Sequence, residues 1–130
     1  MADSTTTLKE LKAKMAAFVK ERDWEKFHSP KNLSMSISIE AAELMEHFQW
    51  CDLEGSKEDL AKDLQEVKHE IADIFCYLLS FCNLYDIDIS QAVSEKLALN
   101  AAKYPAVKVH GSYEKYKKLK KSIKKSTQKR

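Results

Sequence analysis

The chain has 130 residues, of which 44% are hydrophobic and 32% charged, as in one ordinary globular domain. It contains only two glycines and two prolines, so it lacks the closely spaced glycines of a phosphate-binding loop or a dinucleotide fingerprint. The same scarcity argues against an all-β fold, which needs many tight turns. Three cysteines without framework spacing, and no apolar run of about 18 residues, predict a soluble, cytoplasmic protein with reduced thiols.

Charge is distributed unevenly along the chain, although the formal net charge is only +2. Nine of the 22 basic residues, but only one of the 20 acidic residues, lie within residues 111–130. The first 110 residues therefore hold 13 basic and 19 acidic side chains, a net charge of −6, and the remainder carries +8. Dense like charge is typical of solvated extensions. We predict a folded domain over residues 1–110 and a basic, flexible C-terminal tail over residues 111–130.

Apolar residues recur at helical spacing in four stretches, which predicts helices over residues 6–26, 33–50, 57–85 and 89–104. Pro30 lies in the connection before the second helix, Gly55 in the one before the third, and residues 86–88 separate the third from the fourth. We therefore predict an all-α, four-helix bundle-like fold. Because the helices have broad apolar faces, we expect self-association to complete the core.

Two pairs of acidic residues stand three positions apart on neighbouring predicted helices. Glu40 and Glu43 form one pair, and Glu70 and Asp73 the other, so the two side chains of each pair share a helical face. Each pair is rotated from the apolar stripe of its helix in the same sense. Antiparallel packing, stripe to stripe, would bring the four carboxylates to one edge of the helix contact. One difficulty is axial, because the pairs lie at different distances from the connection, a mismatch of about 10 Å that the connection must absorb.

Four convergent carboxylates repel one another unless a cation neutralises them. Oxygen ligands alone suit Mg²⁺, with Mn²⁺ as a substitute, rather than Zn²⁺. Such an ion bridges phosphate oxygens and can activate water. The alternative for each pair is a solvated acidic face, which is the common environment of Glu on a helix. A di-iron centre fits less well, since it needs two inward ExxH elements and residues 66–69 supply only one.

The acidic pairs and their context resemble a known family. Glu40-Ala-Ala-Glu43 followed after 26 residues by Glu70-Ile-Ala-Asp73 is similar to the ExxE…ExxD pattern of the MazG-like superfamily of all-α nucleoside triphosphate pyrophosphohydrolases, and of its dCTP pyrophosphatase branch. Supporting segments lie at residues 21–28, 30–33, 43–44, 48–50, 96–100 and 103–105. Together they cover about residues 8–107, so the resemblance extends over most of the acidic part.

The resemblance implies Mg²⁺-dependent hydrolysis between the α- and β-phosphates of a nucleoside triphosphate, giving the monophosphate and pyrophosphate. Carried over by position, Glu40, Glu43, Glu70 and Asp73 are the metal ligands and catalytic residues. Whether one of the glutamates or a metal-bound hydroxide orients the attacking water stays open. Members of the family are homodimers or homotetramers. The branch implies dCTP or a modified dCTP as substrate. Several residues depart from its pattern and leave the preferred base open: Met15, Ser34, Ser36, Ser38, Ile39 and His69.

Six further residues are candidate substrate contacts in this interpretation: Trp24, Trp50, Tyr77, Lys96, Asn100 and Lys103. The two tryptophans stand near predicted helix ends, where an indole can stack on a base. Tyr77 follows Asp73 by one helical turn, and the last three residues share a face of the fourth helix that suits triphosphate oxygens. The alternatives are packing in a core or interface for the aromatic residues, and a solvated helix face for the other three.

The leading hypothesis is therefore a pyrophosphate-releasing hydrolase that clears or balances the nucleotide pool. A second hypothesis is a non-catalytic helical interaction module whose basic tail binds nucleic acid or an acidic partner. A third keeps the fold but acts on another triphosphate, such as dUTP. For the leading hypothesis we expect a nucleotide substrate and a second copy of the chain as partners, and neither a membrane nor nucleic acid.

Overall fold

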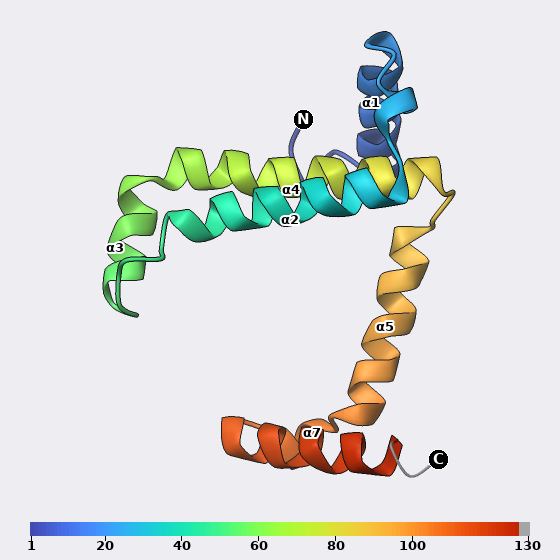
Figure 1. Ribbon diagram of the computed structural model, residues 1–130. Coiled ribbons are helices and arrows are strands. Elements are labelled where there is room, and N and C mark those ends of the chain that lie inside the picture. Colours follow the sequence, from blue (N-terminus) through green and yellow to red (C-terminus); the bar gives the residue numbers. More distant parts are fainter. Residues whose placement is uncertain (128–130) are drawn as a thin grey trace. The chain divides into compact units, whose positions relative to one another are not determined.

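The computed structural model describes residues 1–127, and every regular element in that part is helical (Figure 1). The all-α class is therefore confirmed. No helix in the described part is long and apolar enough to cross a membrane. In chain order the elements are α1 (Leu8–Glu21), the 3₁₀ turn η1 (Glu25–Phe27), α2 (Pro30–Glu46), α3 (Gly55–Lys62), α4 (Leu64–Leu84), α5 (Ile89–Lys103), α6 (Ala106–Val109) and α7 (Tyr113–Thr127).

The chain divides into two compact units, Met1–Ile87 and Asp88–Arg130. The division falls at the turn after α4, where Asp86 has a positive φ of 50°. An aspartate tolerates this left-handed conformation better than most residues, because its short side chain can hydrogen-bond locally. The acidic pairs lie in the first unit, and the basic C-terminal stretch lies in the second.

Helix α4 is the centre of the first unit. Helix α2 runs antiparallel beside it, and α1 packs on its C-terminal half (Figure 1). The apolar side chains that are exposed by 5% or less come from all three helices and are Val19, Leu33, Val67, Leu79 and Cys82. The acidic pairs therefore lie on the two helices that make the most extensive contact in the unit.

Two long-range hydrogen bonds connect α1 to the end of α4. The Asn83 side-chain amide donates to the Lys12 carbonyl at 2.8 Å, and the Lys12 ammonium donates to the Ile87 carbonyl at 2.9 Å. Both groups are partly buried. These reciprocal bonds fix α1 against α4 at a point where apolar packing alone would allow sliding.

Local capping explains where the first two helices begin. Thr7 and Glu10 form a complete capping box on α1, with bonds of 3.2 Å and 2.6 Å. Ser29 caps α2 by accepting from the Asn32 backbone, and Pro30 follows at the first helical position. Helix α2 therefore begins at Pro30 rather than at residue 33, because proline favours this position and does not obstruct the helix there.

The predicted third helix, residues 57–85, is interrupted. Helix α3 ends at Lys62 and α4 begins at Leu64. Asp63 connects them with φ −106° and ψ 19°; its N–H donates to the Asp59 carbonyl and its own carbonyl accepts from Val67. The prediction of one continuous helix was wrong here, because a change of backbone direction at a single residue leaves the apolar periodicity on either side intact.

The second unit consists of α5, α6 and α7. Asp88 caps α5 by accepting from the Gln91 backbone at 2.9 Å. The rings of Tyr104 and Tyr116 lie 5.1 Å apart and link the end of α5 to α7. Residues 113–127 of the basic stretch thus form a helix, and residues 128–130 lie outside the described part. The predicted flexibility of the tail stays a prediction.

Candidate active site

The four acidic residues lie along the contact between α2 and α4. Carboxylate oxygens of Glu40, Glu43 and Glu70 all lie within 4.8 Å of one another. Partial burial raises the pKa of Glu40, and the negative charges of Glu43, Asp73 and Glu70 raise it further. Asp73 therefore acts on the same group electrostatically. Three of the four carboxylates thus converge as their spacing predicted, and Asp73 adds its charge to the same site.

A contact at the end of α2 explains how the acidic pairs reach the same level. His47 Nδ1 lies 3.7 Å from Asp63 Oδ2. In the antiparallel pair of helices, Glu40 precedes His47 by seven residues and Glu70 follows Asp63 by seven, so each glutamate lies two turns away from this contact. The expected axial mismatch is absent because the break at Asp63 starts α4 at Leu64, several residues later than the predicted start at residue 57. Helix α3 (Gly55–Lys62) contains most of the other residues between the end of α2 and the start of α4.

A cavity of about 380 Å³ lies between the η1 region, the N-terminal half of α2 and Tyr77 on α4. It is lined by Trp24, Phe27, His28, Asn32, Leu33, Met35, Ser36, Ile39 and Tyr77. Ser36 stands one turn before Glu40 on α2, and Tyr77 one turn after Asp73 on α4, so the cavity adjoins the acidic site along both helices. Its volume falls in the range of small-molecule sites, and its lining is mostly apolar with a few polar groups.

Trp24 and Tyr77, both predicted as substrate contacts, line this cavity. Trp24 follows α1, and its ring packs edge-on against Phe18, with ring centroids 5.8 Å apart. The Asn32 amide donates to the Phe27 carbonyl at 2.8 Å and holds η1 against the start of α2. These contacts place an aromatic wall of the cavity on a short connection that is fixed at both ends.

Several cavity residues were absent from the predicted set, including Asn32 and Ser36. Both precede Glu40 on α2, by two turns and one turn. Helical spacing from the first glutamate is the signal that could have found them. Phe27 and Ile39 carry no such signal, because apolar residues at these positions look like ordinary packing.

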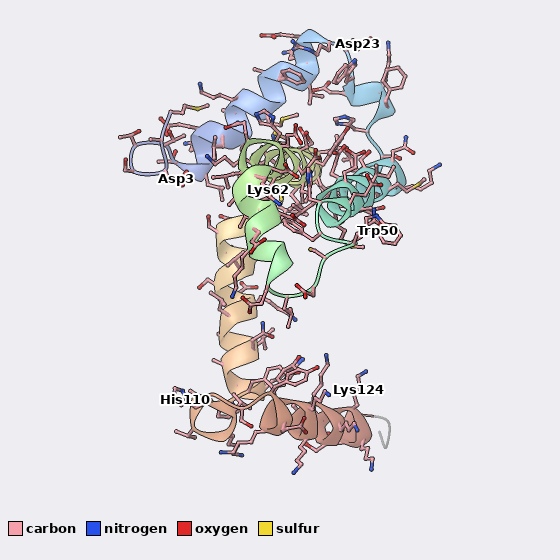
Figure 2. All side chains as sticks on the ribbon, turned by 90° about the vertical axis from the view of Figure 1, so that its left-hand side faces the viewer. Asp3, Asp23, Trp50, Lys62, His110 and Lys124 are labelled. Atoms are coloured by element: carbon pink, nitrogen blue, oxygen red, sulfur yellow. The ribbon has the colours of Figure 1, made fainter. Side chains whose placement is uncertain are left out.

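The other predicted substrate contacts do not line this cavity. Trp50 lies beyond the end of α2 with 91% of its surface exposed, and its side chain is on the outside of the helix pair (Figure 2). Lys96, Asn100 and Lys103 fall on the continuous helix α5, in the second unit. The roles predicted for these four residues stay predictions.

Comparison with known proteins identifies the family. A model of the MazG-like family matches residues 35–119, which include all four carboxylates. The chain belongs to this family. Its MazG-like segment begins on α2 and ends on α7, so the cavity residues from Trp24 to Leu33 lie outside the matched range.

Similar proteins carry pyrophosphatase names. The mouse protein dCTP pyrophosphatase 1 is 37% identical over 112 residues, which are 85% of this chain and 66% of that protein. Human dCTP pyrophosphatase 1 is 34% identical over 115 residues, 87% of this chain and 68% of that one. The MazG-like chain thus spans about two thirds of the length of the curated relatives it matches. A crystal structure of a pyrophosphatase from Archaeoglobus fulgidus is 40% identical, with a TM-score of 0.74 over 81% of this chain and 98% of that one.

Proposed function

We propose that the chain is a Mg²⁺-dependent nucleoside triphosphate pyrophosphohydrolase that cleaves between the α- and β-phosphates. The observation that carries the proposal is the cluster of carboxylates on α2 and α4 beside a cavity of nucleoside size. The names of the relatives and of the A. fulgidus structure support the same reaction class.

The residues of the acidic site fit a hard divalent cation. Three carboxylates within 4.8 Å offer only oxygen ligands, and the raised pKa of Glu40 reflects burial and unneutralised repulsion in the absence of a counter-charge. Oxygen ligands of this kind suit Mg²⁺, and Mn²⁺ as a substitute. When bound, such an ion would offset the negative charge of the triphosphate and polarise its phosphorus–oxygen bonds. Glu40, Glu43, Glu70 and Asp73 are its proposed ligands.

The cavity is the proposed place of the base and sugar. Trp24 offers a ring face for stacking, while Tyr77, Asn32 and Ser36 offer polar groups for orientation. Because the cavity adjoins Glu40 and Asp73, a nucleoside held there would direct its phosphates along the acidic edge. One of the glutamates then orients the attacking water. Trp50, Lys96, Asn100 and Lys103 are proposed as further contacts to base or phosphates.

We propose dCTP or a modified dCTP as the preferred substrate, on the strength of the relatives' names. Another triphosphate, such as dUTP, is the alternative. A panel of ribo- and deoxynucleoside triphosphates, assayed with Mg²⁺ for pyrophosphate release and ranked by kcat/KM, tests both. Hydrolysis of dUTP ahead of dCTP would overturn the base preference but leave the reaction intact. No cleavage of any triphosphate would overturn the enzyme hypothesis and favour a binding module.

Self-association is also part of the proposal. Leu64, Ile71, Phe75 and Leu78 share one face of α4 and are each between 41% and 52% exposed. Apolar side chains gathered in this way are typical of a surface that another chain covers. We propose a homodimer or homotetramer that buries this α4 stripe, and light scattering on the purified protein tests it. A monomer at micromolar concentration would contradict this part alone.

A further inference from the structure

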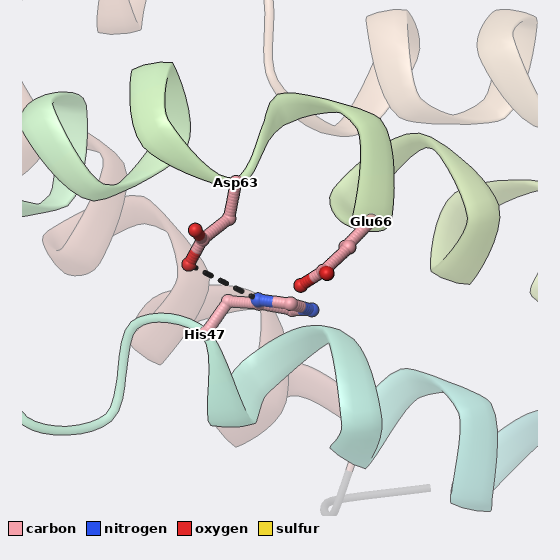
Figure 3. Close-up of side chains that lie close together, drawn as sticks. All are labelled: His47, Asp63 and Glu66. Carbon is pink, nitrogen blue, oxygen red and sulfur yellow. Dashed lines mark ion pairs between the residues drawn. The ribbon is translucent and has the colours of Figure 1, made fainter.

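A second group of ligand-type side chains lies outside the carboxylate site. It consists of His47 at the C-terminal end of α2, Asp63 at the break between α3 and α4, and Glu66 in the first turn of α4 (Figure 3). One nitrogen or oxygen atom from each lies within 4.8 Å of the others. His47 is the most enclosed, with 17% of its side chain exposed, compared with 46% for Asp63. Residues from two helices distant in sequence thus converge on one point.

The two carboxylates of this group could have served as helix caps but do not. Asp63 is the N-cap of α4 and Glu66 is its third helical residue, which is the spacing of a capping box. In α1 the corresponding pair, Thr7 and Glu10, makes both cap bonds. Asp63 makes no side-chain cap bond, and within residues 1–127 Glu66 makes no bond back to it.

Both carboxylates lie beside the His47 ring, Asp63 on its Nδ1 side and Glu66 above the opposite part (Figure 3). The Asp63 backbone is fixed independently, because its N–H and carbonyl bond to Asp59 and Val67. The arrangement therefore does not depend on the side chains closing the helix, and they are available to a ligand. A cation between them would satisfy two negative charges and an imidazole lone pair together.

We propose that His47, Asp63 and Glu66 form a second metal site, which binds a first-row transition metal such as Zn²⁺. One imidazole nitrogen and two carboxylate oxygens are ligands that Zn²⁺ accepts, with water in the remaining position. The Glu40 site offers oxygen only and suits Mg²⁺ instead. The two sites are separated by two helical turns, about 10 Å, along α2 and α4. The different donor atoms allow each site to select a different ion.

A metal at this place would cross-link the end of α2 to the start of α4. Glu40 lies seven residues before His47 on α2, and Glu70 lies seven residues after Asp63 on α4. Fixing this end therefore fixes the relative level of the two acidic pairs. The second site is therefore a structural metal site, and metal binding there does not depend on nucleotide hydrolysis.

Zinc titration of the full chain by calorimetry tests the site. Metal-free protein is first saturated with Mg²⁺ to occupy the carboxylates, and Zn²⁺ is then added without nucleotide. We expect the wild type to bind one further Zn²⁺ per chain. His47→Gln should weaken the zinc affinity by at least about tenfold, the loss that is typical when an interaction around a metal site is removed. Asp63→Asn and Glu66→Gln should weaken it similarly. His69→Gln, whose ring contacts Gln65, and Cys51→Ser are matched controls that should bind as the wild type does.

Thermal unfolding gives an independent measurement for variants that fold. Zn²⁺ should raise the midpoint of the wild type and of His69→Gln in the presence of Mg²⁺, and not that of Asp63→Asn. Equal zinc affinity in His47→Gln and the wild type would overturn the proposal. So would zinc binding that Glu40→Gln abolishes while His47→Gln preserves it, since the ion would then occupy the carboxylate site. Because no nucleotide is present, failure here leaves the proposed hydrolysis untouched.

Discussion

Glu40 is the residue on which the charges of the site concentrate. It is partly buried and faces the negative charges of Glu43, Glu70 and Asp73, which together raise its pKa. A metal-free protein must tolerate this repulsion in its folded state, whereas the unfolded chain separates the charges. The acidic site therefore opposes folding until a cation binds, a cost that is typical of functional sites.

Replacing Glu40 by glutamine should separate stability from activity. We expect Glu40→Gln to raise the Tm of the metal-free protein, because it removes one repelling charge, and to lose the rise in Tm that Mg²⁺ produces. Pyrophosphate release should fall by about 100-fold or more, as for the loss of one electrostatic contact to a reacting group. Glu46→Gln, at the exposed end of the same helix, should keep its turnover. Full turnover in Glu40→Gln would exclude this residue from the site.

Trp24 tests the cavity. It lines the cavity and is 44% exposed, so one part of the indole packs on Phe18 while another remains available to a base. We expect Trp24→Ala to raise KM about 5- to 150-fold, the equivalent of the 1–3 kcal/mol of one stacked base. Trp24→Phe should recover most of the affinity. An unchanged KM in the alanine variant, with normal helicity by circular dichroism, would place the base elsewhere.

At this scale the sequence predicted most of the acidic site and little of the cavity. The carboxylates could be predicted because their i, i+3 spacing is itself the geometry of a helical face. Asn32 and Ser36 were not predicted, because helical spacing from Glu40 is the one signal that they carry and a single polar residue near a helix start has many uses. Which tryptophan adjoins the carboxylates depends on how η1 folds back, and no local pattern encodes that.

At the scale of elements, α2 and α4 carry both the site and much of the core. Leu33 is the largest fully buried side chain, at 1% exposure, and it also lines the cavity. It lies fourteen residues before His47, as Tyr77 lies fourteen after Asp63, so the same register that aligns the glutamates aligns these two residues. Packing and site geometry are thus coupled through one helix pair.

Leu33→Ala should destabilise the fold by about 2–5 kcal/mol, the usual cost of a cavity left by a buried leucine. Urea unfolding followed by circular dichroism measures the loss. Leu33→Met conserves most of the volume and should cost less than about 1.5 kcal/mol. A loss below 1 kcal/mol in the alanine variant would mean that the α2–α4 contact does not dominate stability.

The break at Asp63 shows what periodicity leaves undetermined about elements. Apolar residues on both sides of it keep helical spacing, so residues 57–85 were predicted to form one helix. The change of direction requires only one residue, Asp63, with φ and ψ outside the helical range. In the sequence, an aspartate at such a break looks the same as an aspartate inside a helix. The existence of the helices was predictable, whereas this boundary depended on the contact with α2.

For the whole molecule, the proposed active site and the basic C-terminal stretch lie in different units of the chain. The carboxylates and the cavity belong to the first unit, and the lysines of α7 to the second. On α7, Lys117 and Lys120 lie over the rings of Tyr113 and Tyr116, at 4.5 Å and 5.5 Å from the ring centroids. Two lysines of α7 are thus engaged by aromatic side chains of their own helix.

Deletion of residues 117–130 should therefore leave pyrophosphohydrolase activity within about a factor of two. Steady-state turnover of the truncated chain, measured beside the full chain at equal concentration, checks this. A collapse of activity would mean that α7 contributes to the site or to the assembly. Light scattering on the same sample would distinguish these two causes.

The α4 stripe gives a prediction about assembly. Phe75→Glu places a charge in the exposed apolar face and should lower the oligomeric state at micromolar concentration, because an unpaired charge is costly to bury in an interface. Gln65→Glu adds the same charge to the same helix at an exposed position about 100° around the axis from Leu64, and is the control that should leave assembly unchanged. An unaltered mass for Phe75→Glu would exclude this stripe as the contact.

The short helix α3 has a consequence for how chain length can vary in proteins of this kind. Residues 48–62 separate the acidic pairs along the sequence but do not set their level in space, which depends on His47 opposite Asp63. Insertions or deletions in that segment should be tolerated. One residue inserted between Glu40 and His47 would rotate the first pair by about 100°. The 26-residue gap is therefore incidental, and a search pattern that fixes it would overlook chains with the same site.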